Sequence, residues 1–339
     1  MATSLQLTLC MAACSGAMIG MDSRARADDE TAPKSINLYI GSGPGGGYDY
    51  YGRLAARHLG RHLPGSPSIT PQNMPGAGSI TAANYVYTVA PKDGSVLGIV
   101  SPSVSLIEGL NSPGVRFHAA RFNWIGRLAS IANVSVTWHT SGAKTIDDLK
   151  KREILIAGIS INSPLSMLPR ALNDYAGTQF KLVTGYADSS STMLAMERGE
   201  VEGTTVSWST IKTQKSAWLK DKKINILVQY ALARHRDLPD VPTAIEVAKG
   251  ERERELLSLY VSAADVGYAI FGPPGMASAR VHAMRDGFDR MVMSEALLAD
   301  VAKSQVDFDP ARGVRLQELL IEEAGKFGLL RAERNSSKP

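Results

Sequence analysis

The chain has 339 residues, of which 44% are hydrophobic, 21% charged and 6% aromatic. A chain of this length and composition can bury a large core, and we expect an ordinary soluble protein of two lobes. The formal net charge of +4 is compatible with an anionic ligand or a cell-envelope setting. It is too small to indicate a nucleic-acid partner, and the sequence contains no basic run with interleaved aromatic residues.

The N-terminal segment predicts export. Residues 4–21 are apolar or small, no charge occurs before Asp22, and Ala25-Arg26-Ala27 forms an A-x-A cleavage site. We therefore expect a signal peptide over residues 1–27, cleavage after Ala27, and a periplasmic mature protein. A single membrane anchor is the alternative, although the segment is short and contains several polar residues.

Both cysteines, Cys10 and Cys14, lie in this leader. The stretch Met11-Ala12-Ala13-Cys14 loosely resembles a lipobox, so attachment as a lipoprotein is a further alternative. The mature chain would contain no cysteine, which excludes disulfides, thiolate metal sites and a cysteine nucleophile.

Two strand–glycine loop–helix units follow the leader. Each joins a short apolar strand to a helix through a loop in which glycine supplies positive φ angles. Because the free N–H groups of both helix N-termini would face one region, the two units predict a site for a small anion. The units comprise Ile36–Ile40, Gly41–Gly47 and Tyr48–Leu63, then Ile69–Asn73, Pro75–Gly78 and Ser79–Ala90.

The rest of the chain alternates strands and helices, as α/β folds with ligands at the carboxyl ends of strands do. We expect strands at Val96–Val100, Asn123–Leu128, Asn133–His139, Glu153–Ala157, Phe180–Thr184, Val201–Ser207, Ile224–Tyr230 and Ala263–Phe271. We expect one helix that begins at Thr145, one that ends at about Gly177, one that ends near Gly199, and one over Arg315–Arg331. The segments near residue 130 would cross between lobes, which places lobe 1 at residues 34–130 plus 265–339 and lobe 2 at 131–264.

Six motifs occur in order between Ile36 and the C-terminus. They are Pro44-Gly45-Gly46-Gly47-Tyr48-Asp49, Asn73-Met74-Pro75-Gly76-Ala77-Gly78, Ala90-Pro91-Lys92-Asp93-Gly94, Gly185-Tyr186 with Arg198-Gly199-Glu200-Val201-Glu202, Arg234 with Leu238–Thr243, and Phe271-Gly272-Pro273-Pro274-Gly275. In order and spacing they resemble the extracytoplasmic solute-binding receptors of tripartite tricarboxylate transporters, often called Bug proteins.

The resemblance implies a two-lobed α/β fold of the periplasmic-binding-protein-like type II class, with two parallel or mixed sheets and a ligand cleft between the lobes. Such receptors close over a small organic anion, usually a carboxylate, and deliver it to a membrane permease. We accordingly expect a monomer that is not an enzyme and that binds neither cofactor nor metal.

Carried over by position, the resemblance implies a ligand site built from loops of both lobes. The predicted lobe 1 residues are Gly45, Gly46, Gly47, Asp49, Gly76, Ala77, Gly78, Ser101 and Ser103, and those of lobe 2 are Ser160, Asn162, Ser163, Tyr186, Asp188 and Ser189. The chain departs from the family at Ala187-Asp188, where Lys-Gly is common, and at Val206, where Asp is frequent. The distal half of the ligand is therefore not predicted.

Several motifs have other interpretations. Gly41-x-Gly43-x-x-Gly46 fits the dinucleotide fingerprint, but no acid lies between residues 50 and 92 to hold a ribose. His58 and His62 have the spacing of a zinc pair without a third ligand. Three arginines at positions 53, 57 and 61 share one helix face, which is expected to be exposed, with partner docking as the alternative.

Two further residues are ambiguous from sequence. Asp49 could simply cap the helix that follows it, and Trp208 could be core or a platform for the ligand.

Three classes of function are conceivable for an exported chain of this kind. An exported hydrolase is disfavoured, because the mature chain has no G-x-S-x-G elbow, H-E-x-x-H helix or P-loop. A ligand sensor that reports to a signalling partner would use the same cleft, and the sequence does not separate it from a transport receptor. The transport receptor, supported by the six motifs, is the leading hypothesis.

Overall fold

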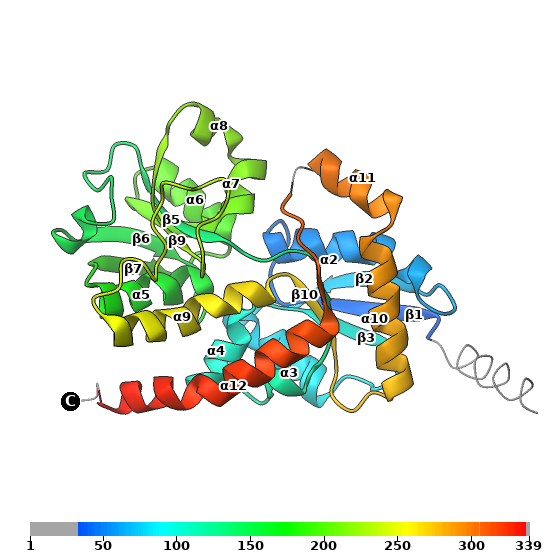
Figure 1. Cartoon of the computed structure of the whole chain (residues 1–339). Coiled ribbons are helices and arrows are strands. Elements are labelled where there is room, and N and C mark those ends of the chain that lie inside the picture. The colour runs from blue at the N-terminus through cyan, green and yellow to red at the C-terminus, as the bar shows by residue number, and fades with distance from the viewer. Residues whose placement is uncertain (1–32, 305, 337–339) are drawn as a thin grey trace, which may run out of the picture.

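The computed structural model describes residues 33–304 and 306–336, which form two β-sheets flanked by helices. The six-stranded sheet has the order β11-β4-β10-β3-β1-β2, and the five-stranded sheet has the order β7-β6-β8-β5-β9. We call the body around the first sheet lobe 1 and the body around the second lobe 2. In Figure 1 the two sheets lie in separate bodies, and α9 (Glu251–Val266) runs from lobe 2 towards lobe 1. The predicted α/β fold class with two mixed sheets is confirmed.

The sheet of lobe 1 combines parallel and antiparallel pairs. Strand β1 pairs in parallel with β2 and β3, whereas β10 is antiparallel to β3 and β4, and β11 is antiparallel to β4. The chain thus returns from lobe 2 into the middle of this sheet through β10. The strands are β1 (Ser35–Ile40), β2 (Ser68–Asn73), β3 (Val96–Ile99), β4 (Asn123–Arg127), β10 (Ala269–Gly272) and β11 (Ala311–Arg312).

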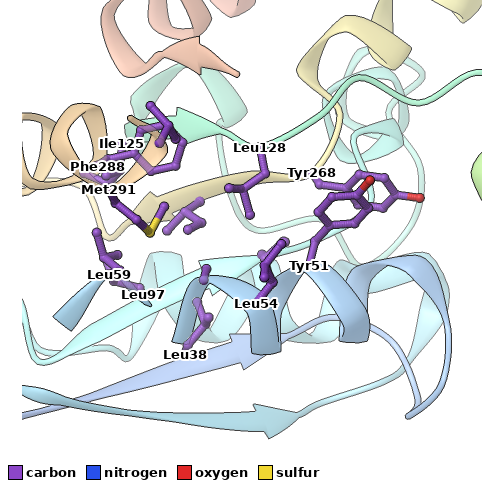
Figure 2. Packing of buried hydrophobic residues seen from close by; sticks show 14 of the residues in the cluster. Leu38, Tyr51, Leu54, Leu59, Leu97, Ile125, Leu128, Tyr268, Phe288 and Met291 are labelled. Carbon is purple, nitrogen blue, oxygen red and sulfur yellow. The ribbon is translucent and has the colours of Figure 1, made fainter. Parts of the chain in front are cut away.

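Helices cover both faces of this sheet because its central strands are apolar on both sides. Neighbouring residues of β3 belong to different cores: Leu97 packs in one and Val96 in the other. Figure 2 shows the first core, in which Leu38 and Leu54 lie opposite Phe288. The helices are α2 (Gly47–His58), α3 (Ile80–Thr88), α4 (Ser103–Gly109), α10 (Ser278–Val292), α11 (Glu295–Ser304) and α12 (Gly313–Ser336), with 3-10 turns at Gly60–His62, Ala77–Ser79 and Ala119–Arg121.

The sheet of lobe 2 has the same mixed character. Strand β6 pairs in parallel with β7 and β8, and β5 is antiparallel to β8 and β9. The strands are β5 (Asn133–Trp138), β6 (Ile154–Gly158), β7 (Phe180–Thr184), β8 (Gly203–Ser207) and β9 (Ile224–Tyr230). The helices are α5 (Pro164–Ala176), α6 (Ser189–Glu197), α7 (Trp208–Gln214), α8 (Ser216–Lys220) and α9, with a 3-10 turn at Asp148–Lys150.

Most predicted elements are confirmed, but two are wrong. The helix expected from Thr145 is only a 3-10 turn, because the Asp148 carboxylate accepts hydrogen bonds from the Lys144 and Thr145 N–H groups and closes a compact loop. The strand expected over Ala263–Phe271 begins only at Ala269, because its first four residues complete α9. Helices α4, α7 and α8 and the short β11 were not predicted.

Gly267 ends α9 at the crossing between the lobes. Its φ of +59° lies in a region that L side chains rarely adopt, and a Cβ there would lie 2.1 Å from the Ala129 carbonyl oxygen. The two crossing segments are joined at this point, since the Tyr268 N–H donates to Ala129 and the Leu128 N–H donates to Tyr268, at 2.8 and 3.1 Å. Glycine is therefore required at the closest approach of the two connections.

The leader and its cleavage site lie outside the described residues, and the predicted lobe boundaries remain a prediction. Among residues 33–304 and 306–336, no helix combines the length and the apolar character that crossing a bilayer requires.

We expect Gly267→Ala to destabilise the protein, because alanine must adopt the positive φ and push against the Ala129 backbone. The expected loss is about 2–4 kcal/mol in free energy of unfolding, measured by urea titration. Gly325→Ala, on a face of α12 where a Cβ meets no atom within 4 Å, is the control and should cause no loss. Equal stability of the two variants would contradict this account of the crossing.

Candidate functional site

A cavity of about 300 Å³ lies between the two lobes. Loops that follow strands β1, β2 and β3 line it from lobe 1, and loops that follow β6, β7 and β8 line it from lobe 2. Strands β1, β2 and β3 are parallel to one another, and so are β6, β7 and β8. The carboxyl ends of each set therefore lie at one edge of its sheet. This is where α/β proteins place their ligands.

Most of the predicted site residues line this cavity. They are Gly46, Gly47, Gly76, Ala77, Gly78, Ser101, Ser160, Ser163, Asp188 and Ser189. Direct contact of these residues with a ligand remains a prediction.

The other predicted residues lie beside the cavity or behind its wall. Gly45 and Asp49 line an adjoining cavity. The Ser103 hydroxyl lies 2.7 Å from that of Ser101. Asn162 packs against Gly78, where a Cβ would come within 2.8 Å of its carbonyl oxygen. Tyr186 packs against the core of lobe 2 instead of the cavity.

Sequence reasoning missed a set of polar and apolar residues on the same wall. The polar ones are Ser42, Tyr48, Ser79, Asn133, Ser207, Thr210 and Tyr268, and the apolar ones include Ile131, Ile159, Leu165 and Val206. Tyr48 lies inside the motif Pro44–Asp49, and Ser79 directly follows the motif Asn73–Gly78. The two motifs therefore indicated the positions of these two residues. No motif indicated Tyr268, because only the return of the chain through β10 brings this residue to the cavity.

The Asp49 carboxylate holds the first glycine loop in place. It accepts hydrogen bonds from the Gly45 N–H at 3.0 Å, from Arg53 Nε at 2.9 Å and from Asn73 Nδ2 at 2.9 Å. Burial of the carboxyl opposes ionisation, but the hydrogen bonds from Arg53, Gly45 and Asn73 outweigh it, so the pKa of Asp49 is lowered. Asp49 therefore ties the loop after β1 to α2 and to the end of β2.

The second glycine loop adopts four consecutive positive φ angles. They are +144° at Gly76, +46° at Ala77, +67° at Gly78 and +77° at Ser79. Two of these residues carry a Cβ, and such strained backbone is concentrated at functional sites. The Ser79 hydroxyl stabilises the turn, since it donates to the Gly41 carbonyl at 2.8 Å and accepts from the Ser101 N–H at 3.1 Å.

Helices α2 and α3 both begin at the cavity wall without a side-chain cap. Gly46, the N-cap of α2, has no side chain, and the side chain of Ser79, the N-cap of α3, accepts no hydrogen bond from its helix. The first N–H groups of a helix have no intrahelical partner, and the helix dipole makes this end positive. The lobe 1 wall therefore presents main-chain donors suited to an anion.

The lobe 2 wall is different, because two of its three helices, α6 and α7, have a side-chain cap at the N-terminus. Asp188 caps α6 by accepting from the Ser191 N–H at 2.8 Å, and Ser207 caps α7 by accepting from the Thr210 N–H at 3.2 Å. Helix α5 starts at Pro164, which has no N–H.

The cavity wall is close to neutral in side-chain charge. Among the described residues, no Lys, Arg or His lines it, and Asp188 is its one ionisable acid. Burial raises the pKa of the Tyr268 hydroxyl to about 12, and burial also raises the pKa of Tyr48. Both tyrosines therefore remain neutral hydrogen-bond donors at physiological pH.

An adjoining cavity of about 320 Å³ shares Gly46, Gly47, Thr210 and Tyr268 with the first. It contains two of the three arginines that the sequence placed on one helix face. Arg53 is bound to Asp49 and Arg57 lies 3.4 Å from Asp300. These cations are thus paired within the protein.

The lobes contact each other beside this second cavity. Lys212 of α7 lies 2.6 Å from Asp307 of lobe 1 and 2.9 Å from Asp237 of lobe 2. Gln214 of α7 also donates to the Gly45 carbonyl at 3.2 Å. Ligand atoms of His235, Asp237 and Asp307 lie within 4.8 Å of one another, as in a metal site, but the Lys212 ammonium already bonds both carboxylates.

No family model and no curated protein matches the sequence. Solved structures do match. A TctC solute-binding protein from Polaromonas is 17% identical with a TM-score of 0.61, over 88% of this chain and 98% of that chain. The periplasmic binding protein BugD is 16% identical with a TM-score of 0.67, over 88% and 97%. MatC from Rhodopseudomonas palustris, with bound malate, is 17% identical with a TM-score of 0.66, over 86% and 97%.

The fold is that of a periplasmic solute-binding protein. The structural neighbours are the class of protein that the six motifs resemble, and the matches cover nearly the whole of each neighbour. Identity at this level shows the fold and does not by itself establish the function.

We expect Asp49→Asn to lower the free energy of unfolding by about 1–3 kcal/mol at neutral pH, because charge-assisted hydrogen bonds are lost. Since folding lowers the pKa of Asp49, the carboxylate stabilises the protein above the ordinary Asp pKa of about 3.9 and ceases to do so as the pH falls through the lowered value. The difference between wild type and variant in urea titrations should therefore shrink below about pH 4.

Asp147→Asn is the matched control, because that carboxylate is 70% exposed and bonds only to Lys150 of the same turn. Its effect should stay under about 0.5 kcal/mol at every pH. A difference for Asp49→Asn that does not depend on pH would show that the charge of Asp49 does not hold the loop.

Proposed function

We propose that this protein is an exported solute-binding protein that captures a small organic anion, a carboxylate, between its lobes. It delivers the ligand to a membrane permease of the tripartite tricarboxylate type. The proposal includes a signal peptide cleaved after Ala27, a monomeric receptor, and no catalytic step. The observation that carries it is the pair of uncapped helix N-termini, α2 and α3, that face one cavity.

Main-chain donors are sufficient to bind a carboxylate in this position. A buried anion without hydrogen bonds is strongly disfavoured, and each charge-assisted hydrogen bond contributes about 1.5–3 kcal/mol. The glycines at 46, 76 and 78 line the cavity and carry no side chain that could cover their own amide groups. Neutral amides also release their ligand more readily than a buried salt bridge, which suits a carrier.

The wall of the cavity supports binding more than catalysis. Its hydroxyl groups have no histidine or lysine beside them among the lining residues of the described chain, so no serine or threonine is activated as a nucleophile there. A sensor would use the same cavity. Transport is favoured because the neighbours with this fold include TctC and MatC, the latter with malate bound.

A thermal-shift screen tests the proposal. The purified protein is heated with mono-, di- and tricarboxylates, nucleotides and neutral sugars. A ligand at about 100 times its dissociation constant adds about 2.7 kcal/mol to the stability of the folded state. For a chain of this size we expect at least one carboxylate to raise the melting temperature by roughly 3–6 °C. A response to nucleotides or sugars with none to any acid would refute the proposed function.

We expect Gly46→Val to abolish carboxylate binding without unfolding the protein. A Cβ at Gly46 meets no atom within 4 Å, and its φ of −89° is accessible to valine, so the side chain can extend into the cavity space. Isothermal titration calorimetry should show a loss of at least about 100-fold in affinity, equivalent to two lost charge-assisted hydrogen bonds.

Gly325→Val on the exposed face of α12 is the control and should bind normally. Far-ultraviolet circular dichroism of both variants should match the wild type. Undiminished affinity in Gly46→Val would mean that the ligand lies elsewhere.

A further inference from the structure

The two walls of the cavity offer unequal numbers of free donors. On lobe 1, α2 and α3 begin without side-chain caps, although the first N–H of α3, that of Ile80, donates to the Ala77 carbonyl. On lobe 2, Asp188 caps α6, Ser207 caps α7, and Pro164 removes the first N–H of α5. Lobe 1 thus offers uncapped N-termini of two helices to one anionic group, and lobe 2 offers fewer main-chain donors to a second.

The lobe 2 wall also carries a negative charge of its own. The Asp188 carboxylate accepts from the Ser191 N–H and hydroxyl through one oxygen, at 2.8 and 2.9 Å. Among the described lining residues no cation lies near enough to offset it within the cavity. A second ligand carboxylate in this small space would meet a like charge, which raises the free energy of the complex.

Much of the remaining wall is apolar. Ile131, Ile159, Leu165 and Val206 line the cavity together with the ring of Tyr268. These side chains favour a hydrocarbon or aromatic body and cannot hydrogen-bond a polar one. The Ser160 hydroxyl oxygen is buried and has no hydrogen-bond partner among the described residues, so it can serve one neutral polar group of a ligand.

We propose that the ligand is a monocarboxylate with an apolar body, either aromatic or alkyl, and that the cavity discriminates against dicarboxylates. The carboxylate lies at the α2 and α3 N-termini, and the apolar body lies against lobe 2 beside Asp188. This inference rests on the proposed function and narrows it to one substrate class. It sets the protein apart from MatC, whose structure contains malate.

Matched ligand pairs test the discrimination by isothermal titration calorimetry at neutral pH. Benzoate is compared with terephthalate, and hexanoate with adipate, so the members of each pair differ in the distal carboxylate. We expect the monoacid of at least one pair to bind at least about tenfold more tightly than its diacid. The reason is the repulsion between the distal carboxylate of the diacid and Asp188 at an intermediate effective dielectric constant.

Equal or tighter binding of the diacids would overturn the inference and leave the proposed function intact. Binding of neither class, with a response to nucleotides or sugars, would overturn both. The two failures are thus distinguishable.

The variant Asp188→Asn tests the cause. Asparagine is as good an N-cap as aspartate, so α6 should keep its cap while the wall loses its charge. We expect the preference for monoacid over diacid to fall by about tenfold, which corresponds to one charge repulsion removed. Asp148→Asn removes a turn-capping carboxylate of the same lobe that does not line the cavity, and its preference should equal that of the wild type. An unchanged preference in Asp188→Asn would overturn the assigned role of Asp188.

Discussion

The arrangement of the candidate site depends on the Asp49 carboxylate. By bonding Gly45, Arg53 and Asn73 it joins the loop after β1 to α2 and to the end of β2. The N-terminus of α2 is thereby fixed at the cavity wall, although Gly46 provides no cap of its own. The buried Asp49 thus positions main-chain donors at the cavity wall, and its charge stabilises the site without lying in the cavity.

The second glycine loop is also held at the cavity wall, in a strained backbone conformation. Ala77 and Ser79 adopt φ angles that favour glycine, and the Ser79 hydroxyl stabilises the turn through Gly41 and Ser101. The loops after β1, β2 and β3 are therefore joined into one wall. Lobe 2 contributes hydroxyl groups and apolar side chains instead, so the two walls of the cavity differ in chemistry.

The sequence was sufficient to predict the α/β class, nearly all the strands, and ten of the 26 residues that line the cavity. Glycine spacing and apolar runs report local backbone conformation directly, so the loops after β1 and β2 were predicted correctly. Tyr268 and Thr210 could not be predicted, because their positions depend on how the chain returns through β10 and how α7 packs. The positive φ angles of Ala77 and Ser79 could not be predicted either, because alanine and serine rarely adopt them. Tyr186 was assigned to the site, but it packs against the core of lobe 2.

The contact of Lys212 with both Asp237 and Asp307 spans the gap between the lobes. In the proposed receptor, separation of the lobes would leave Lys212 with Asp237 and expose Asp307 to water. Dissolved salt screens the attraction between Lys212 and Asp307, so it would favour the separated state. The rate at which a ligand escapes would then depend on the ionic strength of the surrounding medium.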